Sequence, residues 1–213
     1  LLSGQCVARR PGSGGASEGL RDEVETHGNE GRMQSQAAAI NHEGDRVTSI
    51  DVESQAGSYN LAVEQLVSSM PLTELVLAMR PAAPEDVVAA AKTLRYRDLI
   101  TVNLMIDKDQ VTDQTWIYIH DPTITLGRIH EPKNWSVEMA PAGKSSIVAE
   151  YFCFAGDDVW NMNDQDLVDL TVSDLDKRLG FLKKEEVIDG FVVRVPKAYP
   201  MYELGYDEPL KKV

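Results

Sequence analysis

Apolar residues recur with helical spacing in four segments of the chain. In two of these segments a proline, Pro71 or Pro84, stands in the first turn, where the missing amide hydrogen of proline costs nothing. In the other two, the side chain of Ser17 or Asn163 can cap the helix by accepting a backbone hydrogen bond. Gly180 ends the last of them. The pattern therefore predicts four helices.

Runs of alternating or β-branched residues predict six strands. They cover residues 36–40, 46–52, 99–106, 115–119, 146–154 and 191–195. The first two flank the polar residues 41–45 and are expected to form a two-stranded ribbon around a turn. Residues 99–106 are apolar enough to be buried on both faces of a sheet. Because helices and strands do not alternate strictly, we predict an α+β fold with a mixed sheet and flanking helices.

The 213-residue chain carries a formal net charge of −13. An acidic surface repels the phosphate backbone, so we do not expect nucleic-acid binding. No run approaches the roughly 18 apolar residues of a membrane span, so we expect no transmembrane segment. The chain begins Leu1-Leu2 without a charged-then-apolar leader, which favours a cytoplasmic location. Both ends read as cuts in a longer protein.

The residues that could hold a metal or form a disulfide do not have a matching spacing. Two cysteines, Cys6 and Cys153, are too few for a disulfide framework or a zinc cluster. Cys153 lies in an apolar run, so a small buried hydrophobe is expected there rather than a reactive thiol. The two His-acid pairs at 120–121 and 130–131 are ten residues apart and match no ligand spacing. We therefore predict no metal site and interpret both pairs as polar loop residues.

Two glycine-containing segments resemble nucleotide-binding loops only in part. Residues 12–17 lack the third glycine of a dinucleotide loop, and no strand precedes them. Residues 142–145 lack the first glycine of a phosphate loop and are better explained as a turn between strands. The three tryptophans can line a pocket or pack in the core, and the sequence does not decide between the two roles.

Several longer strings, in this order along the chain, resemble one family of proteins. The strings are Asp45-Arg46-Val47, Val67-Ser68-Ser69-Met70-Pro71-Leu72, Leu94-Arg95-Tyr96-Arg97-Asp98, Trp116-Ile117-Tyr118-Ile119-His120-Asp121-Pro122, Gly127-Arg128-Ile129, Asn134-Trp135-Ser136, Glu150-Tyr151-Phe152 and Val195-Pro196-Lys197-Ala198-Tyr199-Pro200-Met201-Tyr202. From about residue 17 to the C-terminus, the chain resembles FAD-dependent oxidoreductases of the amine oxidase and protoporphyrinogen oxidase type. UDP-galactopyranose mutases have a related layout.

The resemblance implies a division into parts. Residues 1–16 would be a divergent or disordered loop, and residues 17–80 would belong to an FAD-binding domain of α/β type. Residues 81–198 would form a substrate-binding domain built on a mixed sheet, and residues 199–213 would return towards the FAD domain. In this family the flavin accepts a hydride, and the protein supplies orientation and a dry pocket for a small-molecule substrate.

The resemblance also implies roles for individual residues. Ala37, Ser69 and Tyr199 match positions that contact FAD. Arg128 matches a position that can pair with a carboxylate or phosphate of the substrate, and Tyr202 matches a tyrosine that approaches the substrate or the flavin. No residue is matched to a catalytic role, because no nucleophile or His-acid pair has a spacing that demands one.

The sequence departs from the family in the parts that grip the cofactor. Family members carry a GxGxxG loop before this region and a glycine-rich flavin segment after it, and neither is present here. Residues 37–39 are alanines where a valine usually meets the adenine. We therefore expect the chain by itself to be inactive and to bind FAD only weakly. A mutase of nucleotide sugars and a binding module without catalysis stay open as alternatives.

Overall fold

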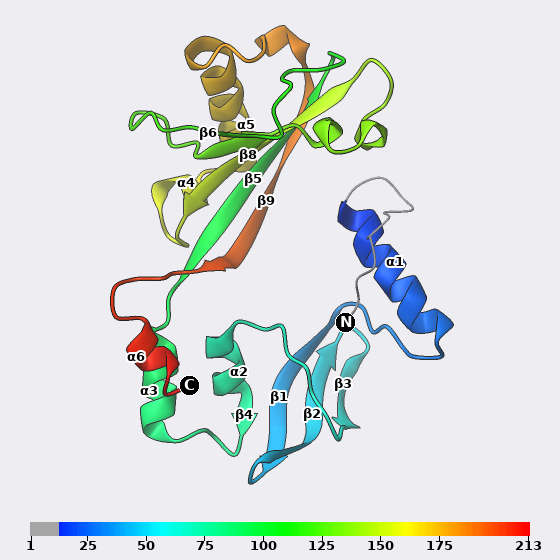
Figure 1. Ribbon diagram of the computed structural model, residues 1–213, viewed down its shortest axis with the longest axis vertical. Coiled ribbons are helices and arrows are strands. Elements are labelled where there is room, and N and C mark those ends of the chain that lie inside the picture. Colours follow the sequence, from blue (N-terminus) through cyan, green and yellow to red (C-terminus); the bar gives the residue numbers. More distant parts are fainter. Residues whose placement is uncertain (1–12) are drawn as a thin grey trace. The chain divides into compact units, whose positions relative to one another are not determined.

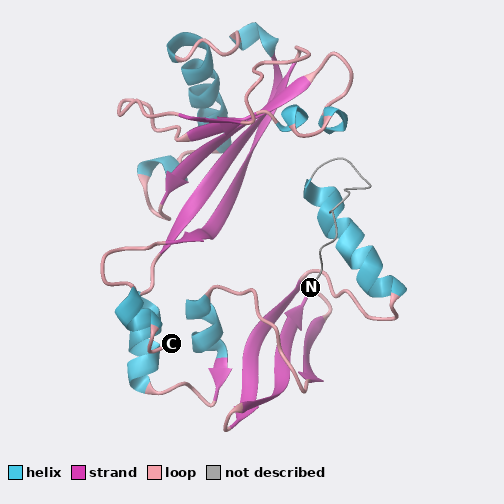
Figure 2. Ribbon diagram, viewed as in Figure 1, coloured by secondary structure: helices cyan, strands magenta, loops and turns pink. Residues whose placement is uncertain are grey.

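The computed structural model describes residues 13–213, and for side chains residues 18–213. The chain forms two compact units, each assembled from two stretches of sequence (Figures 1 and 2). Of the described residues, the first unit contains 13–29 and 97–198. The second unit contains residues 30–96 and 199–213. No helix of the described residues is long and apolar enough to cross a membrane.

The second unit is built on a four-stranded sheet in the order β3-β2-β1-β4. Strands β1 (Ser35–Glu43) and β2 (Arg46–Ser54) form the predicted antiparallel ribbon. The first strand runs further than expected, so the turn is confined to residues 44–45. Sequence analysis missed β3 (Gly57–Ala62), which pairs with β2, and the short β4 (Met79–Arg80), which lies parallel to β1. The parallel pair makes this sheet mixed.

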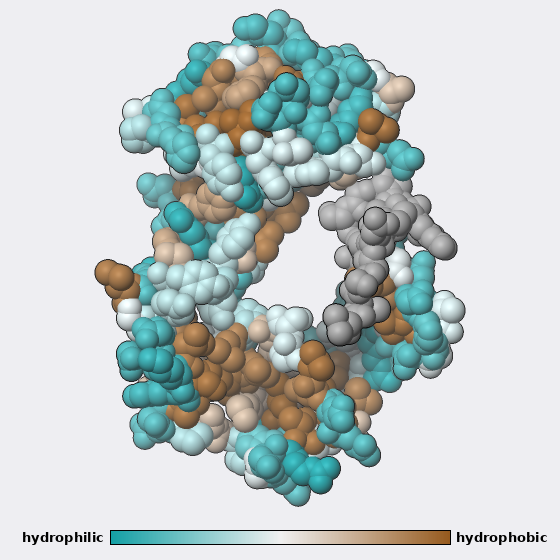
Figure 3. All heavy atoms as spheres, viewed as in Figure 1, coloured by the Kyte–Doolittle hydropathy of each residue, from teal (hydrophilic) through white to brown (hydrophobic). Residues whose placement is uncertain are grey.

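Three helices belong to the second unit. They are α2 (Leu72–Ala78), α3 (Glu85–Thr93) and α6 (Asp207–Leu210). The first two begin directly after Pro71 and Pro84, as the proline positions predicted. Hydrophobic side chains gather on the part of the unit that carries α2 and β1, in the lower half of Figure 3.

The first unit is built on a five-stranded sheet in the order β6-β7-β8-β5-β9. The strands are β6 (Trp116–Tyr118), β7 (Arg128–His130), β8 (Ser145–Cys153), β5 (Tyr96–Ile106) and β9 (Val187–Pro200). Strands β6, β7, β8 and β5 pair antiparallel in that order. Hydrogen bonds from Asp107 to Glu186 and from Lys197 to Asp98 show that β9 also runs antiparallel to β5.

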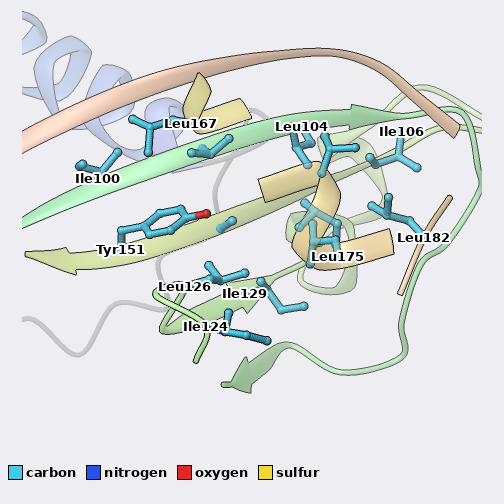
Figure 4. Close-up of a cluster of buried hydrophobic side chains, with 14 of the residues drawn as sticks. Ile100, Leu104, Ile106, Ile124, Leu126, Ile129, Tyr151, Leu167, Leu175 and Leu182 are labelled. Carbon is cyan, nitrogen blue, oxygen red and sulfur yellow. The ribbon is translucent and has the colours of Figure 1, made fainter. Parts of the chain in front are cut away.

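A hydrophobic core packs on one face of this sheet, below helix α5 (Asp164–Ser173) (Figure 4). The core side chains include Ile100, Leu104, Tyr151, Leu167 and Leu175, all fully buried. Asn163 caps α5 as predicted, because its side chain accepts a hydrogen bond from the Asp166 amide at 2.9 Å. A π-helical turn, Asp174–Arg178, continues α5 and lets Leu175 reach the core.

Further short elements complete the chain. Helix α4 (Asp158–Asn161) precedes α5, and 3-10 turns occupy Pro132–Asn134, Val137–Met139 and Lys184–Glu186. Helix α1 (Ser13–Thr26) begins four residues before the predicted start at Ser17. The glycines at 14 and 15 have low helix propensity and concealed this first turn. The remainder of the predicted N-terminal loop, residues 1–12, and Cys6 lie outside the described residues.

The expectation that residues 99–106 are buried on both faces of the sheet was wrong. Residues 99–106 are buried on one face only: Ile100, Val102 and Leu104 are fully buried, while the alternate residues are partly exposed and Met105 is 42% exposed. His130 lies in strand β7 and not in a loop, while Glu131 lies in a loop as expected but is fully buried. A buried carboxylate has to be satisfied by hydrogen bonds, and this requirement organises the loops around it.

Candidate functional site

Strand alternation gives the five-stranded sheet a second face, opposite the core. Residues i and i+2 of a strand share a face, so this surface is formed by the neighbours in sequence of the core residues. It carries six large apolar side chains that are at least 38% exposed: Met105, Trp116, Tyr118, Phe191, Val193 and Val195. We call this surface, with the buried Glu150 and the partly buried Arg128, His130 and Phe152 between these residues, the open face.

A carboxylate bound to two basic side chains lies on the open face. Glu150 Oε2 accepts hydrogen bonds from Arg128 Nη2 at 2.5 Å and from Arg128 Nε at 3.1 Å. The other carboxylate oxygen, Oε1, lies 3.1 Å from Nδ1 of His130. The side chain of Glu150 is only 5% exposed, and those of Arg128 and His130 are 17% exposed. Strand register explains the grouping, because Arg128 on β7 stands directly opposite Glu150 on β8.

Two opposing effects, burial and the neighbouring basic side chains, determine the pKa of Glu150. Burial by itself would raise the pKa of the carboxyl group. The hydrogen bonds from Arg128 and the close approach of His130, together with their charges, outweigh burial and lower the pKa below its ordinary value of 4.5. Glu150 is therefore an anion at neutral pH, and its charge holds both basic side chains in place.

Aromatic rings surround the guanidinium of Arg128. Its Cζ atom lies 5.7 Å from the ring centroid of Trp116, 5.5 Å from that of Tyr118 and 5.6 Å from that of Phe152. The Tyr118 hydroxyl also accepts a hydrogen bond from Arg128 Nη1 at 3.1 Å. Rings at this distance attract the cation and limit its side-chain rotamers. The guanidinium is thus fixed by a carboxylate and by three rings.

A second tryptophan extends this aromatic surface to His130. The rings of Trp116 and Trp135 meet edge to face at 5.0 Å, and the ring of Trp135 lies 5.1 Å from that of His130. Trp116 is 51% exposed and Trp135 is 46% exposed. We call the group formed by Arg128, Glu150, His130, Trp116, Tyr118, Phe152 and Trp135 the Arg128 cluster. It combines exposed rings with positive charge, which suits a ligand that has an apolar ring and an anionic group.

Gly127 allows Phe152 to reach the Arg128 cluster. A Cβ atom at this glycine would lie 2.7 Å from Cδ2 and 3.0 Å from Cε2 of the Phe152 ring. Any other residue would push the ring away. The amide of Gly127 also donates a hydrogen bond to the Glu150 carbonyl at 3.0 Å, which holds the backbone of Gly127 close to β8.

The buried Glu131 holds together the loops that lie next to the Arg128 cluster. Its carboxylate accepts hydrogen bonds from the amides of Val111 and Thr112, at 3.0 and 2.7 Å, and from the Ser145 hydroxyl. Asn134 adds bonds to the carbonyls of Thr112 and Gln114, at 2.8 and 2.9 Å. The loop that ends at Trp116 and the turn that carries Trp135 are therefore tied together.

Solved structures share the fold over most of the chain. A reduced UDP-galactopyranose mutase has a TM-score of 0.74 at 18% identity, over 96% of this chain and 43% of that one. A putative protoporphyrinogen oxidase from Exiguobacterium sp. 255-15 has a TM-score of 0.66 at 16% identity, over 92% and 42%. A putrescine oxidase has a TM-score of 0.56 at 10% identity, over 84% and 36%. No family profile and no curated protein sequence matches the chain.

The chain shares the fold of these solved structures. The resemblance expected from the sequence and the predicted α+β class are thereby confirmed at the level of fold. The chain spans less than half the length of each of these three solved chains. It therefore corresponds to a part of that fold.

The residues matched to FAD contacts lie in the second unit. Ala37 is half-buried in β1 beside a register shift, and Ser69 is exposed in the segment before α2. Tyr199 is 41% exposed near the end of β9. All three keep accessible surface, but the flavin-binding role of each stays a prediction.

Of the two residues matched to the substrate, Arg128 lies in the Arg128 cluster and Tyr202 does not. Tyr202 is 73% exposed in the second unit, and its ring meets that of Tyr206 edge to face at 5.1 Å. His130 and Glu150 were not predicted as site residues from the sequence. The only available sign was that Arg128 and His130 are two residues apart, which places them on one face of a strand.

Neither metal nor thiol chemistry is evident in the described part of the chain. Residues 13–213 contain no group of three metal-capable side chains. Cys153 is 2% exposed, and burial, with the nearby charge of Asp98, raises the pKa of its thiol. A buried neutral thiol is a poor nucleophile, which agrees with the expected role as a small hydrophobe.

Proposed function

We propose that this chain is the substrate-binding part, with a portion of the FAD-binding part, of a flavin-dependent oxidoreductase. The observation that carries the proposal is the Arg128 cluster, set on the exposed face of a sheet in a fold shared with flavoenzymes. The open face would form a wall of the substrate pocket. The protein would act on a small molecule with a ring, and we expect it to work in the cytoplasm.

The residues matched to the cofactor fit an extended planar group. Ala37 offers a small side chain, Ser69 an exposed hydroxyl and Tyr199 a partly exposed ring. Val67, two residues before Ser69, is 98% exposed, and a bound cofactor would bury such an apolar side chain. When bound, FAD would supply the acceptor for a hydride from the substrate.

The side chains of this chain would bind and orient the substrate. Arg128 would attract its anionic group, and Glu150 would keep the guanidinium from turning away. Trp116 and Trp135 would cover the apolar ring of the substrate and exclude water. Such fixed positioning is how a binding domain raises the rate of a reaction that a cofactor performs.

A mutase is the second candidate. The structural match with the highest TM-score among those given above is a UDP-galactopyranose mutase, at 0.74. A nucleotide sugar has both rings and phosphate charges, so the Arg128 cluster suits it equally well. The two candidates differ in whether the substrate is oxidised.

The protein encoded by the complete reading frame provides the test. We expect it to purify with flavin that absorbs near about 450 nm and to lose that absorbance when an oxidisable substrate reduces it anaerobically. Arg128→Gln should keep the flavin and raise KM for an anionic substrate by about tenfold, the equivalent of one charged hydrogen bond. Lys108→Gln, which removes an exposed cation paired with Glu186, is the control. A protein without flavin would refute the proposal. Isomerisation of UDP-galactopyranose without net oxidation would establish the mutase.

A further inference from the structure

Arg97 is a second arginine of the open face. It lies in β5 two residues before Leu99, which stands directly opposite Phe152 on β8. Residues i and i+2 of a strand share a face, so Arg97 projects from the same face as Phe152. Its Cζ atom lies 5.7 Å from the ring centroid of Phe152 and 5.9 Å from that of Phe154. Two phenyl rings therefore hold this guanidinium, much as aromatic rings hold that of Arg128.

The charge of Arg97 is not balanced by a carboxylate. In the part of the chain whose side chains the structure describes, no acidic group forms an ion pair with its guanidinium. The adjacent Asp98 is 7% exposed, and its carboxylate accepts from the backbone amides of Ala155 and Lys197 instead. Partly buried charges are normally paired. The partner of this cation is therefore expected to come from a ligand.

The hydrogen-bonding groups of Arg97 are also incompletely used. Its Nε atom is buried and has no hydrogen-bond partner. Nη2 makes one long hydrogen bond, to the Phe152 carbonyl at 3.4 Å, and Nη1 donates to no group of the described residues. A guanidinium offers five N–H donors in one plane and binds carboxylate or phosphate oxygens through them. The terminal nitrogens of Arg97 are therefore available to an anionic group.

Phe152 connects Arg97 to the Arg128 cluster. The Cζ atoms of the two arginines lie 5.7 Å and 5.6 Å from the centroid of this one ring, so they are at most about 11 Å apart. A single small molecule can reach both. The two cations differ in their surroundings, because Glu150 neutralises much of the charge of Arg128 and no such group accompanies Arg97 among the described residues.

We propose that Arg97 is a second anion-binding residue of the open face and that the ligand carries two anionic groups, either carboxylates or phosphates. One group binds Arg128, the other binds Nη1 and Nη2 of Arg97, and the part of the ligand between them lies over Phe152. The inference rests on the proposed function for the role of Arg128, and it adds a second charge to the ligand. The chain has a net charge of −13 and repels dianions in general, so only local positive charge can favour one.

Two substituted benzoates that differ by one carboxylate test this inference. 4-Carboxymethylbenzoate has two carboxylates on one ring, whereas 4-methylbenzoate keeps the ring and only one carboxylate, and all three groups are ionised at neutral pH. Binding to the full chain can be followed by tryptophan fluorescence, since Trp116 and Trp135 belong to the Arg128 cluster. We expect the Kd of the dicarboxylate to be about tenfold lower than that of the monocarboxylate, as for one additional charged hydrogen bond.

Variants of Arg97 separate a binding role from a structural one. Arg97→Gln should raise the Kd of the dicarboxylate by about tenfold and leave that of 4-methylbenzoate unchanged, because Arg128 still binds the single carboxylate. Loss of a purely structural residue would instead affect both ligands alike. The matched control is Arg80→Gln, since the Arg80 guanidinium also bonds only backbone carbonyls, those of Leu77 and Met79, but lies exposed in the second unit. That variant should keep the preference, and circular dichroism would show that each variant is folded.

A second pair of probes distinguishes carboxylates from phosphates. Inorganic pyrophosphate and inorganic phosphate are compared by their ability to displace 4-methylbenzoate, and a preference for pyrophosphate that Arg97→Gln removes would identify the groups as phosphates. The inference is overturned if neither pair of probes shows a preference for the ligand with two anionic groups, or if the preference survives in Arg97→Gln. The flavin content of the complete protein and the effect of Arg128→Gln on KM do not depend on Arg97, so the proposed function could stand while this inference fell.

Discussion

One carboxylate oxygen of Asp98 accepts a hydrogen bond from the backbone amide of Lys197 at 2.6 Å, across 99 residues of sequence. The other oxygen accepts from the amide of Ala155 at 2.5 Å. Lys197 has a φ of +54°, a conformation that residues other than glycine adopt rarely. The carboxylate thus fixes a strained residue of β9 beside the start of β5.

Asp98→Asn should lower the free energy of unfolding by about 2 kcal/mol, because the amide nitrogen that replaces one carboxylate oxygen cannot accept a hydrogen bond and leaves one of the two backbone amides unpaired. Urea unfolding followed by circular dichroism measures this change. Asp113→Asn is the comparison, since Asp113 is exposed and bonds only its neighbour Gln114. Equal stability of the two variants would show that Asp98 does not hold the strand.

Gly127→Ala should disturb the Arg128 cluster by steric pressure. The added methyl group would contact the Phe152 ring at 2.7 Å, and displacing the ring should cost about 1–3 kcal/mol. Loss of the Phe152 contact should also weaken the binding of benzoate, a probe with one ring and one carboxylate, which tryptophan fluorescence detects. Gly19→Ala is the control, because nothing lies within 4 Å of a Cβ atom there and α1 should gain helix propensity.

Glu150 should make stability depend on pH in a defined direction. The carboxyl has a lowered pKa in the folded chain, so it stabilises the fold above pH 4.5, its ordinary value. That contribution is lost as the pH falls through the lower pKa of the folded state. Unfolding by urea between pH 3 and pH 7 should therefore show a loss in acid, and Glu150→Gln should reduce the slope.

At pH 7, Glu150→Gln should destabilise the chain by about 2 kcal/mol, since Arg128 would be left partly buried without its carboxylate partner. Glu25→Gln removes a carboxylate of an exposed ion pair on α1 and serves as the control. A slope unchanged by Glu150→Gln would show that other carboxylates account for the acid sensitivity.

Tyr151 and Thr171 should show coupled energies in the core. The Thr171 hydroxyl donates to the Leu167 carbonyl at 2.7 Å, so the Tyr151 hydroxyl at 2.8 Å donates to Thr171. Thr171→Val would leave the buried Tyr151 hydroxyl unpaired, at a cost of about 1–3 kcal/mol. Adding Tyr151→Phe should restore part of that stability. A strictly additive double-mutant cycle would contradict the coupling.

The sequence predicted the elements that have a clear pattern. Proline and cap residues located α2, α3 and α5, and β-branched runs located β5 and β8. It missed β3, because that strand is mostly exposed and has no alternation of buried and exposed residues. It also missed β7, since three residues between a glycine and Glu131-Pro132 are too few to show a period.

The candidate site was harder to predict, because its grouping depends on register. Arg128 was selected through the resemblance alone. Glu150 lies 22 residues away from it and His130 was interpreted as a loop residue. Only the pairing of β7 with β8 brings the three side chains together. Spacing along the chain does not contain that information, since the number of residues in a loop does not fix which strand residues face each other.

The hydrogen bonds of Glu131 and Asn134 have a thermodynamic consequence for ligand binding. They hold the two loops next to Trp116 and Trp135 in one arrangement before any ligand arrives. A ligand then meets a preorganised aromatic surface and does not have to order it, which saves about 0.5–1.5 kcal/mol for each side chain already fixed. Calorimetry of benzoate binding should accordingly show a smaller entropy loss in the unaltered chain than in Asn134→Ala, where the loops are released.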